Sequence, residues 1–116
     1  MPTGGHPARA EAMATLGRIA HEKFVDEEVG RLLERLRPLE EELDYDSDDA
    51  SLIRVVRRDW EKQSRVPTEL RAEMIRAGAL GNQIWIEARE KSDFSMFLPA
   101  LERNLELRRR YVECFE

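Results

Sequence analysis

The sequence has 116 residues, enough for one domain with a core but too few for two. Hydrophobic residues make up 41% and charged residues 37%, which is typical of a soluble helical protein with charged outer faces. Aromatic residues amount to 7%, and long runs rich in Val, Ile and Thr are absent, which disfavours a β-sandwich or barrel. The composition therefore predicts a single all-α domain over residues 1–116.

Net charge and the absence of targeting signals limit the kinds of partner and the location that the sequence predicts. The net charge is −5, and 19 basic and 24 acidic residues are mixed along the chain, which argues against a nucleic-acid partner. The run Arg108–Arg110 splays by about 100° per residue around a helix and predicts a solvated helix end. No apolar run approaches the roughly 20 residues of a membrane span, and no signal peptide is visible. With the single cysteine, Cys114, these features predict a cytoplasmic protein with no membrane partner.

The first two helices are predicted from residue spacing and caps. After a flexible start at residues 1–6, a helix is expected from about Pro7 to Phe24. Its apolar face is expected to carry Met13, Leu16, Ala20 and Phe24, which recur at spacings of three and four. Asp26 is the expected N-cap of the second helix. Pro38 predicts a kink or break in that helix, because proline lacks an N–H and crowds the preceding turn.

An acidic run, Asp44–Asp49, predicts a linker. Its short polar side chains favour turns and caps over helix interior. A calcium loop is the alternative, but Gly is missing at the sixth place and Val55 stands where a bidentate Glu would be needed. A loop that ends in an N-cap is therefore favoured. The third helix is expected from about Asp48 to Arg65, with Trp60 in its buried stripe.

Two more helices complete the predicted fold. Thr68 is expected to cap the fourth helix, whose apolar side runs from Leu70 to Ala88 with Trp85 beside it. A short turn at Asp93–Phe97 is expected next, with Pro99 in the first turn of the last helix. The apolar face of the last helix is expected to consist of Leu101, Leu105, Val112 and Phe115. These elements predict an antiparallel bundle of about five helices.

No catalytic, cofactor-binding or metal site can be assembled from the residues. His21-Glu22 begins a pattern in which a second histidine would be needed at the fifth place, where Val25 stands. His21 is therefore expected on a helix surface beside Glu22 rather than on a metal. Cys114 has no histidine near it in sequence, and no Gly-rich phosphate loop occurs. Trp60 and Trp85 are better explained by core packing than by ligand stacking.

Three motifs in order nevertheless resemble a known family. They are Met1-Pro2-x-Gly4-Gly5 with Ala8–Leu16 and Ile19–Glu22, then Asp59–Lys62 with Arg65–Leu70, then the stretch Trp85–Glu102. Together they resemble the N-terminal helical region of the HExxH zinc metallocarboxypeptidases of the carboxypeptidase Taq type. The resemblance implies that the zinc ligands and catalytic Glu of that family lie in later segments, so none is carried onto this sequence.

The resemblance leaves two hypotheses for function. The favoured one is a stand-alone, non-catalytic homologue that acts through protein contacts and self-association, as a dimer. The alternative is a fragment or non-catalytic chain of a metal-dependent carboxypeptidase whose HExxH half lies elsewhere, which would make a peptidase-family protein its partner. No cofactor is expected under either hypothesis.

Overall fold

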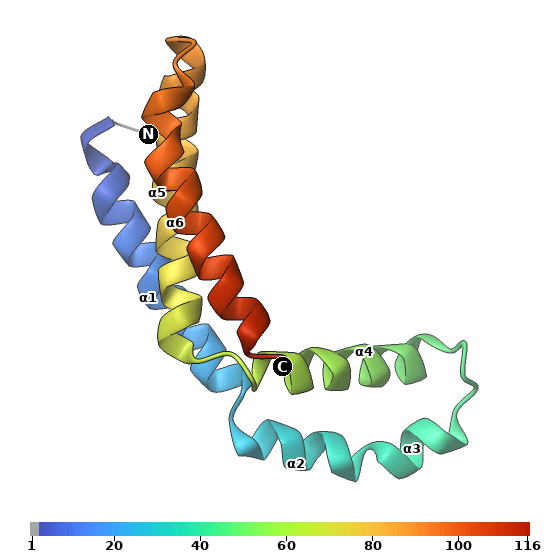
Figure 1. Cartoon of the computed structure of the whole chain (residues 1–116). Coiled ribbons are helices and arrows are strands. Elements are labelled where there is room, and N and C mark those ends of the chain that lie inside the picture. The colour runs from blue at the N-terminus through green and yellow to red at the C-terminus, as the bar shows by residue number, and fades with distance from the viewer. Residues whose placement is uncertain (1–2) are drawn as a thin grey trace. The chain divides into compact units, whose positions relative to one another are not determined.

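The computed structural model describes residues 3–116, and this part of the chain is built from helices (Figure 1). The elements are η1 (Thr3–Gly5, a single 3₁₀ turn), α1 (His6–Phe24), α2 (Glu27–Arg35), α3 (Arg37–Glu42), α4 (Asp48–Gln63), α5 (Thr68–Glu90) and α6 (Phe94–Glu113). No strand occurs within this range, which confirms the all-α class. Residues 1 and 2, where the expected flexible start begins, lie outside it. Across residues 3–116, no helix combines the length and apolar character that crossing a bilayer requires.

Short polar side chains begin three of the helices. Asp26 accepts a hydrogen bond from a backbone N–H at the start of α2, and Asp93 does the same at the start of α6. Ser47 caps α4 in the same way. Each such cap stabilises its helix by about 1 kcal/mol. The predicted cap at Asp26 is confirmed.

The chain breaks near Pro38, as the sequence predicts. Helix α2 ends at Arg35 and α3 begins at Arg37, with Leu36 between them. Pro38 lies in the first turn of α3, where an N–H has no partner within the helix and its absence costs nothing. Helix α4 begins at Asp48, so the last two residues of the acidic run form its first turn. Carboxylates there are favoured by the helix dipole.

Two predicted helix starts are wrong. Thr68 is already the first residue of α5, preceded by Pro67, and is not its N-cap. The turn expected at Asp93–Phe97 is shorter, because α6 begins at Phe94 directly after its cap. The reversal is made at Ser92, whose φ of 50° lies in the left-handed region. Pro99 is therefore the sixth residue of α6, where its ring is tolerated at the loss of one backbone hydrogen bond.

The chain divides into two compact units, residues 1–20 with 66–116 and residues 21–65. The single domain expected from the length stays a prediction. In the first unit α5 and α6 form an antiparallel hairpin (Figure 1). Its core consists of Val66, Leu70, Met74 and Leu107, with Ala77, Tyr111, Cys114 and Phe115 packed around them. The rings of Tyr111 and Phe115 meet edge to face at 5.1 Å between centroids.

Within the same unit, α1 lies along α5 through small residues. Ala10 and Ala14 are fully buried, and the Ile75 side chain occupies the space next to Gly17. Because the buried side chains on α1 are small, this contact offers little apolar area. Ion pairs between the two helices flank it and fix them antiparallel.

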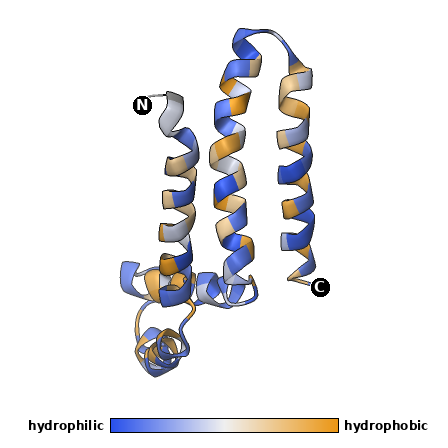
Figure 2. Cartoon of the chain, turned by 90° about the vertical axis from the view of Figure 1, so that its left-hand side faces the viewer, coloured by the Kyte–Doolittle hydropathy of each residue, from blue (hydrophilic) through white to orange (hydrophobic). Residues whose placement is uncertain are grey.

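The predicted apolar face of α1 is wrong. Leu16 is 67% exposed and Ile19 44%, so these two side chains point away from α5, while Met13, 40% exposed, borders a hollow between α1 and α5. Figure 2 shows apolar and hydrophilic residues alternating along α1, α5 and α6. The 3.6-residue spacing identified an apolar stripe correctly, but the neighbouring helix packs on the alanine stripe beside it.

In the second unit, α2 and α3 pack against α4. Leu33 and Ile53 are buried, and the Trp60 ring lies directly against Gly30 of α2. Arg57 of α4 donates to Glu40 Oε2 at 2.6 Å and to the Leu33 carbonyl at 3.3 Å, which ties α4 to both shorter helices.

Candidate functional site

His21, which the sequence predicts not to bind a metal, links α1 to the end of α4. Its Nε2 lies 3.0 Å from the Gln63 carbonyl oxygen at the end of α4. Because a carbonyl only accepts, Nε2 carries the proton in this hydrogen bond. The side chain is 6% exposed, so the expected helix-surface position beside Glu22 is wrong. Within the described residues, no group of three or more His, Cys, Asp or Glu side chains is placed to hold a metal ion.

A hollow of about 640 Å³ lies between α2 and α4 in the second unit, lined by Gly30, Leu33, Arg57 and Trp60 among others. The Trp60 Nε1 and Arg57 Nε atoms have no hydrogen-bond partner in the described part of the chain. Both atoms are shielded from solvent, so a molecule in the hollow would meet the apolar ring rather than these donors. Charged side chains of both signs also line the hollow, namely Glu27, Arg31, Glu34, Arg35 and Glu61, so its lining favours neither an anionic nor a cationic ligand.

The Trp85–Glu102 stretch forms an open aromatic surface. Trp85 is 42% exposed and Phe94 63%, so the core-packing interpretation of Trp85 is wrong. Together with Phe97 they line a hollow of about 380 Å³ at the end of the α5–α6 hairpin. The guanidinium of Arg89 lies over the Trp85 ring, 5.1 Å from its centroid.

This hollow continues along α5 into two more. A hollow of about 260 Å³ is bounded by Gly78, Gly81, Asn82 and Trp85 of α5 with residues of α6. A third, of about 640 Å³, lies between α5 and α1 and shares Gly78 and Asn82 with the second. We call these three hollows the α5 groove. Neighbouring hollows share lining residues of α5, and all three lie within the first unit.

The walls of the α5 groove are apolar and its polar groups are mostly uncharged or cationic. Met13 and Ile86 border the hollow next to α1, and the three aromatic rings border the other end. Arg9 makes no ion pair, and the side-chain amides of Asn82 and Gln83 make no hydrogen bond, within residues 3–116. The one carboxylate among the lining residues is Asp93, which caps α6.

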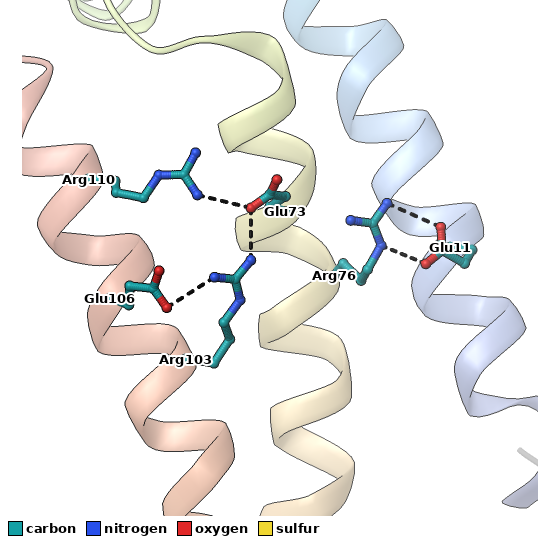
Figure 3. A network of polar contacts seen from close by, with 6 residues as sticks. All are labelled: Glu11, Glu73, Arg76, Arg103, Glu106 and Arg110. Carbon is teal, nitrogen blue, oxygen red and sulfur yellow. Dashed lines mark hydrogen bonds and ion pairs between the residues drawn. The ribbon is translucent and has the colours of Figure 1, made fainter.

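The opposite side of α5 is tied down by ion pairs (Figure 3). Glu73 Oε2 accepts hydrogen bonds from Arg103 at 2.9 Å and Arg110 at 3.2 Å, both on α6. Arg76 of α5 forms a bidentate pair with Glu11 of α1, at 2.6 and 3.2 Å. These ion pairs hold α1 and α6 in register with α5. The three helices that border the α5 groove are therefore fixed relative to one another.

A second bidentate pair joins α1 to α5. Arg18 donates to both carboxylate oxygens of Glu69, at 2.8 and 3.1 Å. The hydrogen bonds from Arg18 lower the pKa of the Glu69 carboxyl below its usual value. Because the Glu69 side chain is 71% exposed, solvent screens this pair and its main effect is alignment.

The α5 groove could be anticipated from the sequence in part. Gly78 and Gly81 stand out in the interior of a predicted helix, where each lowers helix stability by about 1 kcal/mol relative to Ala. Gly81 is explained by Asn104 of α6, whose amide nitrogen would lie 3.2 Å from an added Cβ. A Cβ at Gly78 would meet nothing, which leaves the floor of the groove open. No sequence pattern indicates that Arg9 and Asn82 line this groove.

Comparison with known proteins defines the class of this helical chain. The family model for carboxypeptidase Taq (M32) metallopeptidases matches residues 1–116. The chain therefore belongs to this family. It is 33% identical over 113 residues to thermostable carboxypeptidase 1 of Thermus thermophilus, and 30% identical over 113 residues to the protein of the same name from Pyrococcus furiosus. Carboxypeptidase 1 of Bacillus subtilis is 28% identical over 112 residues.

These matches cover 96–97% of this chain but 22% of each relative, so the chain spans about a fifth of their length. No solved structure shows significant similarity. The resemblance inferred from the three motifs is confirmed.

Proposed function

We propose that this chain is a non-catalytic helical module that acts through protein contacts, including contacts with a second copy of itself. The observation that carries the proposal is the outward face of α1. Its large side chains, Leu16 and Ile19, are 67% and 44% exposed, whereas Ala10 and Ala14 are buried. Contiguous exposed apolar surface on a protein marks sites of interaction with other proteins.

The expected dimer is weak. Fully burying one such side chain stabilises a complex by about 1.5–3 kcal/mol, and these side chains are already half-buried. A single helix face also falls short of the roughly 800 Å² per partner found in stable complexes. Self-association should therefore depend on concentration across the micromolar to millimolar range.

Sedimentation equilibrium of the full chain from about 10 μM to 1 mM tests this. The average mass should rise with concentration, and Leu16→Glu should hold it at the monomer value, because a carboxylate would be desolvated at the contact. Leu52→Glu is the matched control, since Leu52 is 62% exposed on α4. A monomer at every concentration, or equal effects of both variants, would refute self-association through α1.

The short span of the match favours a second candidate function. Because the chain corresponds to a fifth of its relatives, it would be a fragment or a non-catalytic chain of a metal-dependent carboxypeptidase whose HExxH half lies elsewhere. The test is to purify the Thermus thermophilus relative without the matched segment and to mix it with this chain. A stable complex with restored zinc-dependent peptidase activity supports this candidate, and the absence of a complex contradicts it.

Both candidates treat the isolated chain as inactive and without a cofactor. A peptidase assay with added zinc or cobalt should therefore give no turnover, and measured turnover would overturn this part of the proposal. We also propose a reducing, cytoplasmic location, which suits the single half-buried thiol of Cys114. Nucleic acid and membrane are not among the proposed partners, since the net charge is −5.

A further inference from the structure

We propose that the α5 groove binds an acidic amphipathic helix of a partner protein. The inference rests on the proposed role in protein contacts and names the chemistry of the partner. It concerns a different surface from the outward face of α1, so the two proposals can fail separately.

The shape of the groove suits a helix. Its floor follows α5 from Gly78 to Ala88, eleven residues that span about 15 Å of helix axis. Three successive hollows along that length match apolar side chains that recur at spacings of three and four on a docked helix. Gly78 has no side chain and is exposed, which lets a second helix backbone approach α5 closely.

The charges at the groove select an acidic partner. Arg9 lies at one end without an ion pair, and Arg89 lies at the other end with only the face of the Trp85 ring as its recorded contact in the described chain. The chain as a whole carries five more acidic than basic residues, yet Asp93 is the one carboxylate among the lining residues of the groove. Carboxylates on a docked helix would supply the bidentate partners that guanidinium groups bind best.

A second copy is a poor occupant of this groove. Two-fold pairing of the groove with itself would set one depression against another and leave both unfilled. It would also bring the arginines of both copies to one interface without carboxylates between them. A separate helix that carries both the apolar ridge and the acidic side chains meets both needs.

The probe is a labelled 18-residue peptide, acetylated and amidated, with Leu at helical spacings of three and four and Glu on both flanks. Its counterpart carries Lys in place of every Glu. Fluorescence anisotropy with the full-length chain should show micromolar binding of the Glu peptide, weakened by salt, and at least about tenfold weaker binding of the Lys peptide. Equal binding of the two peptides, or no binding of either at 1 mM protein, would overturn the proposal.

Two variants locate the binding. Arg89→Glu removes the cation. Gly78→Leu adds an apolar side chain to the floor at a position where a Cβ meets nothing within 4 Å, and Leu favours a helix. Each should weaken binding of the Glu peptide at least about tenfold, while Arg109→Glu, an equal change on exposed α6 surface, should change it less than about twofold. Unchanged binding to Gly78→Leu would place the peptide elsewhere and refute the groove.

The same variants distinguish self-association through α1 from peptide binding in the α5 groove. Leu16→Glu should leave peptide binding unchanged, and Gly78→Leu should leave the sedimentation mass unchanged. If Gly78→Leu instead abolishes self-association, a second copy fills the groove and the proposal of a separate acidic helix is wrong.

Discussion

The contact between Gly30 and Trp60 gives a sharp test of how α2 packs on α4. A Cβ added at Gly30 would lie 2.6 Å from Trp60 Cζ2 and 2.7 Å from Cη2, about 1 Å closer than an ordinary van der Waals contact. The change Gly30→Ala therefore forces the indole or the α2 backbone to move. Overpacking of this kind costs about 1–3 kcal/mol.

The expected net effect follows from two opposed contributions. Replacing glycine by alanine in a helix interior stabilises the protein by about 1 kcal/mol. Gly30→Ala should therefore lower the free energy of unfolding by about 0–2 kcal/mol. Gly78→Ala serves as the control, because its Cβ meets nothing, and it should raise the free energy of unfolding by about 0.5–1 kcal/mol.

Urea unfolding measures the difference between the two variants. In a Trp85→Phe background the remaining indole, Trp60, reports directly on the α2–α4 contact, and circular dichroism follows the helices as a whole. The two alanine variants should differ by about 1–3 kcal/mol. If Gly30→Ala stabilises the protein as much as Gly78→Ala does, the ring does not press on α2 and the reasoning fails.

Three further predictions follow from packing and charge. Glu40→Ala should lower the free energy of unfolding by about 2 kcal/mol in urea titrations, because the side chain of its partner Arg57 is 11% exposed and would lose its charge partner; an effect below about 0.5 kcal/mol would contradict this. Leu107→Ala should lower the free energy of unfolding by about 2–5 kcal/mol in thermal unfolding, since Leu107 is 1% exposed. Leu105→Ala on the exposed side should lower it by less than about 1 kcal/mol, and equal effects of the two variants would contradict the described core. The lowered pKa of Glu69 stabilises the folded chain fully above the unfolded-state pKa of about 4.5, and this contribution is lost as the pH falls through the lower folded-state pKa. Arg18→Gln should therefore flatten the dependence of stability on pH below about 4.5 and leave its slope near pH 7 unchanged.

Helix boundaries could be predicted from the sequence where a local signal sets them. Asp26 and Asp93 cap helices because a short carboxylate reaches a backbone N–H two residues away, and Pro38 breaks a helix because it lacks an N–H. These causes act within one turn of the chain. The prediction fails at Thr68 because Pro67 takes the N-cap position and makes Thr68 the first residue of α5.

The choice of buried face could not be predicted in the same way. On α1 the Met13–Leu16 side and the Ala10–Ala14 side are both apolar, and the fold buries the alanines. On α6 the predicted Leu105 is 49% exposed, whereas Leu107 is in the core. Periodicity finds apolar stripes, but the position of the neighbouring helix decides which stripe is covered.

The candidate site shows the same limit. The Trp85–Glu102 stretch was singled out by sequence, but its exposure depends on what α1 and α6 leave open. His21 was assigned to a surface because its partner, the Gln63 carbonyl, is 42 residues away and carries no side-chain signal. Long-range backbone contacts of this kind have no pattern in a single sequence.

The ion pairs between α1 and α5 also encode a direction. Glu11 and Arg18 are seven residues apart on α1, and their partners Arg76 and Glu69 are seven residues apart on α5. In a parallel arrangement of the same two helices, Glu11 would face Glu69 and Arg18 would face Arg76, so both pairs would repel. The small, nearly uniform side chains between α1 and α5 would fit either orientation of the two helices. The four exposed charges add little to stability, but they disfavour the parallel orientation.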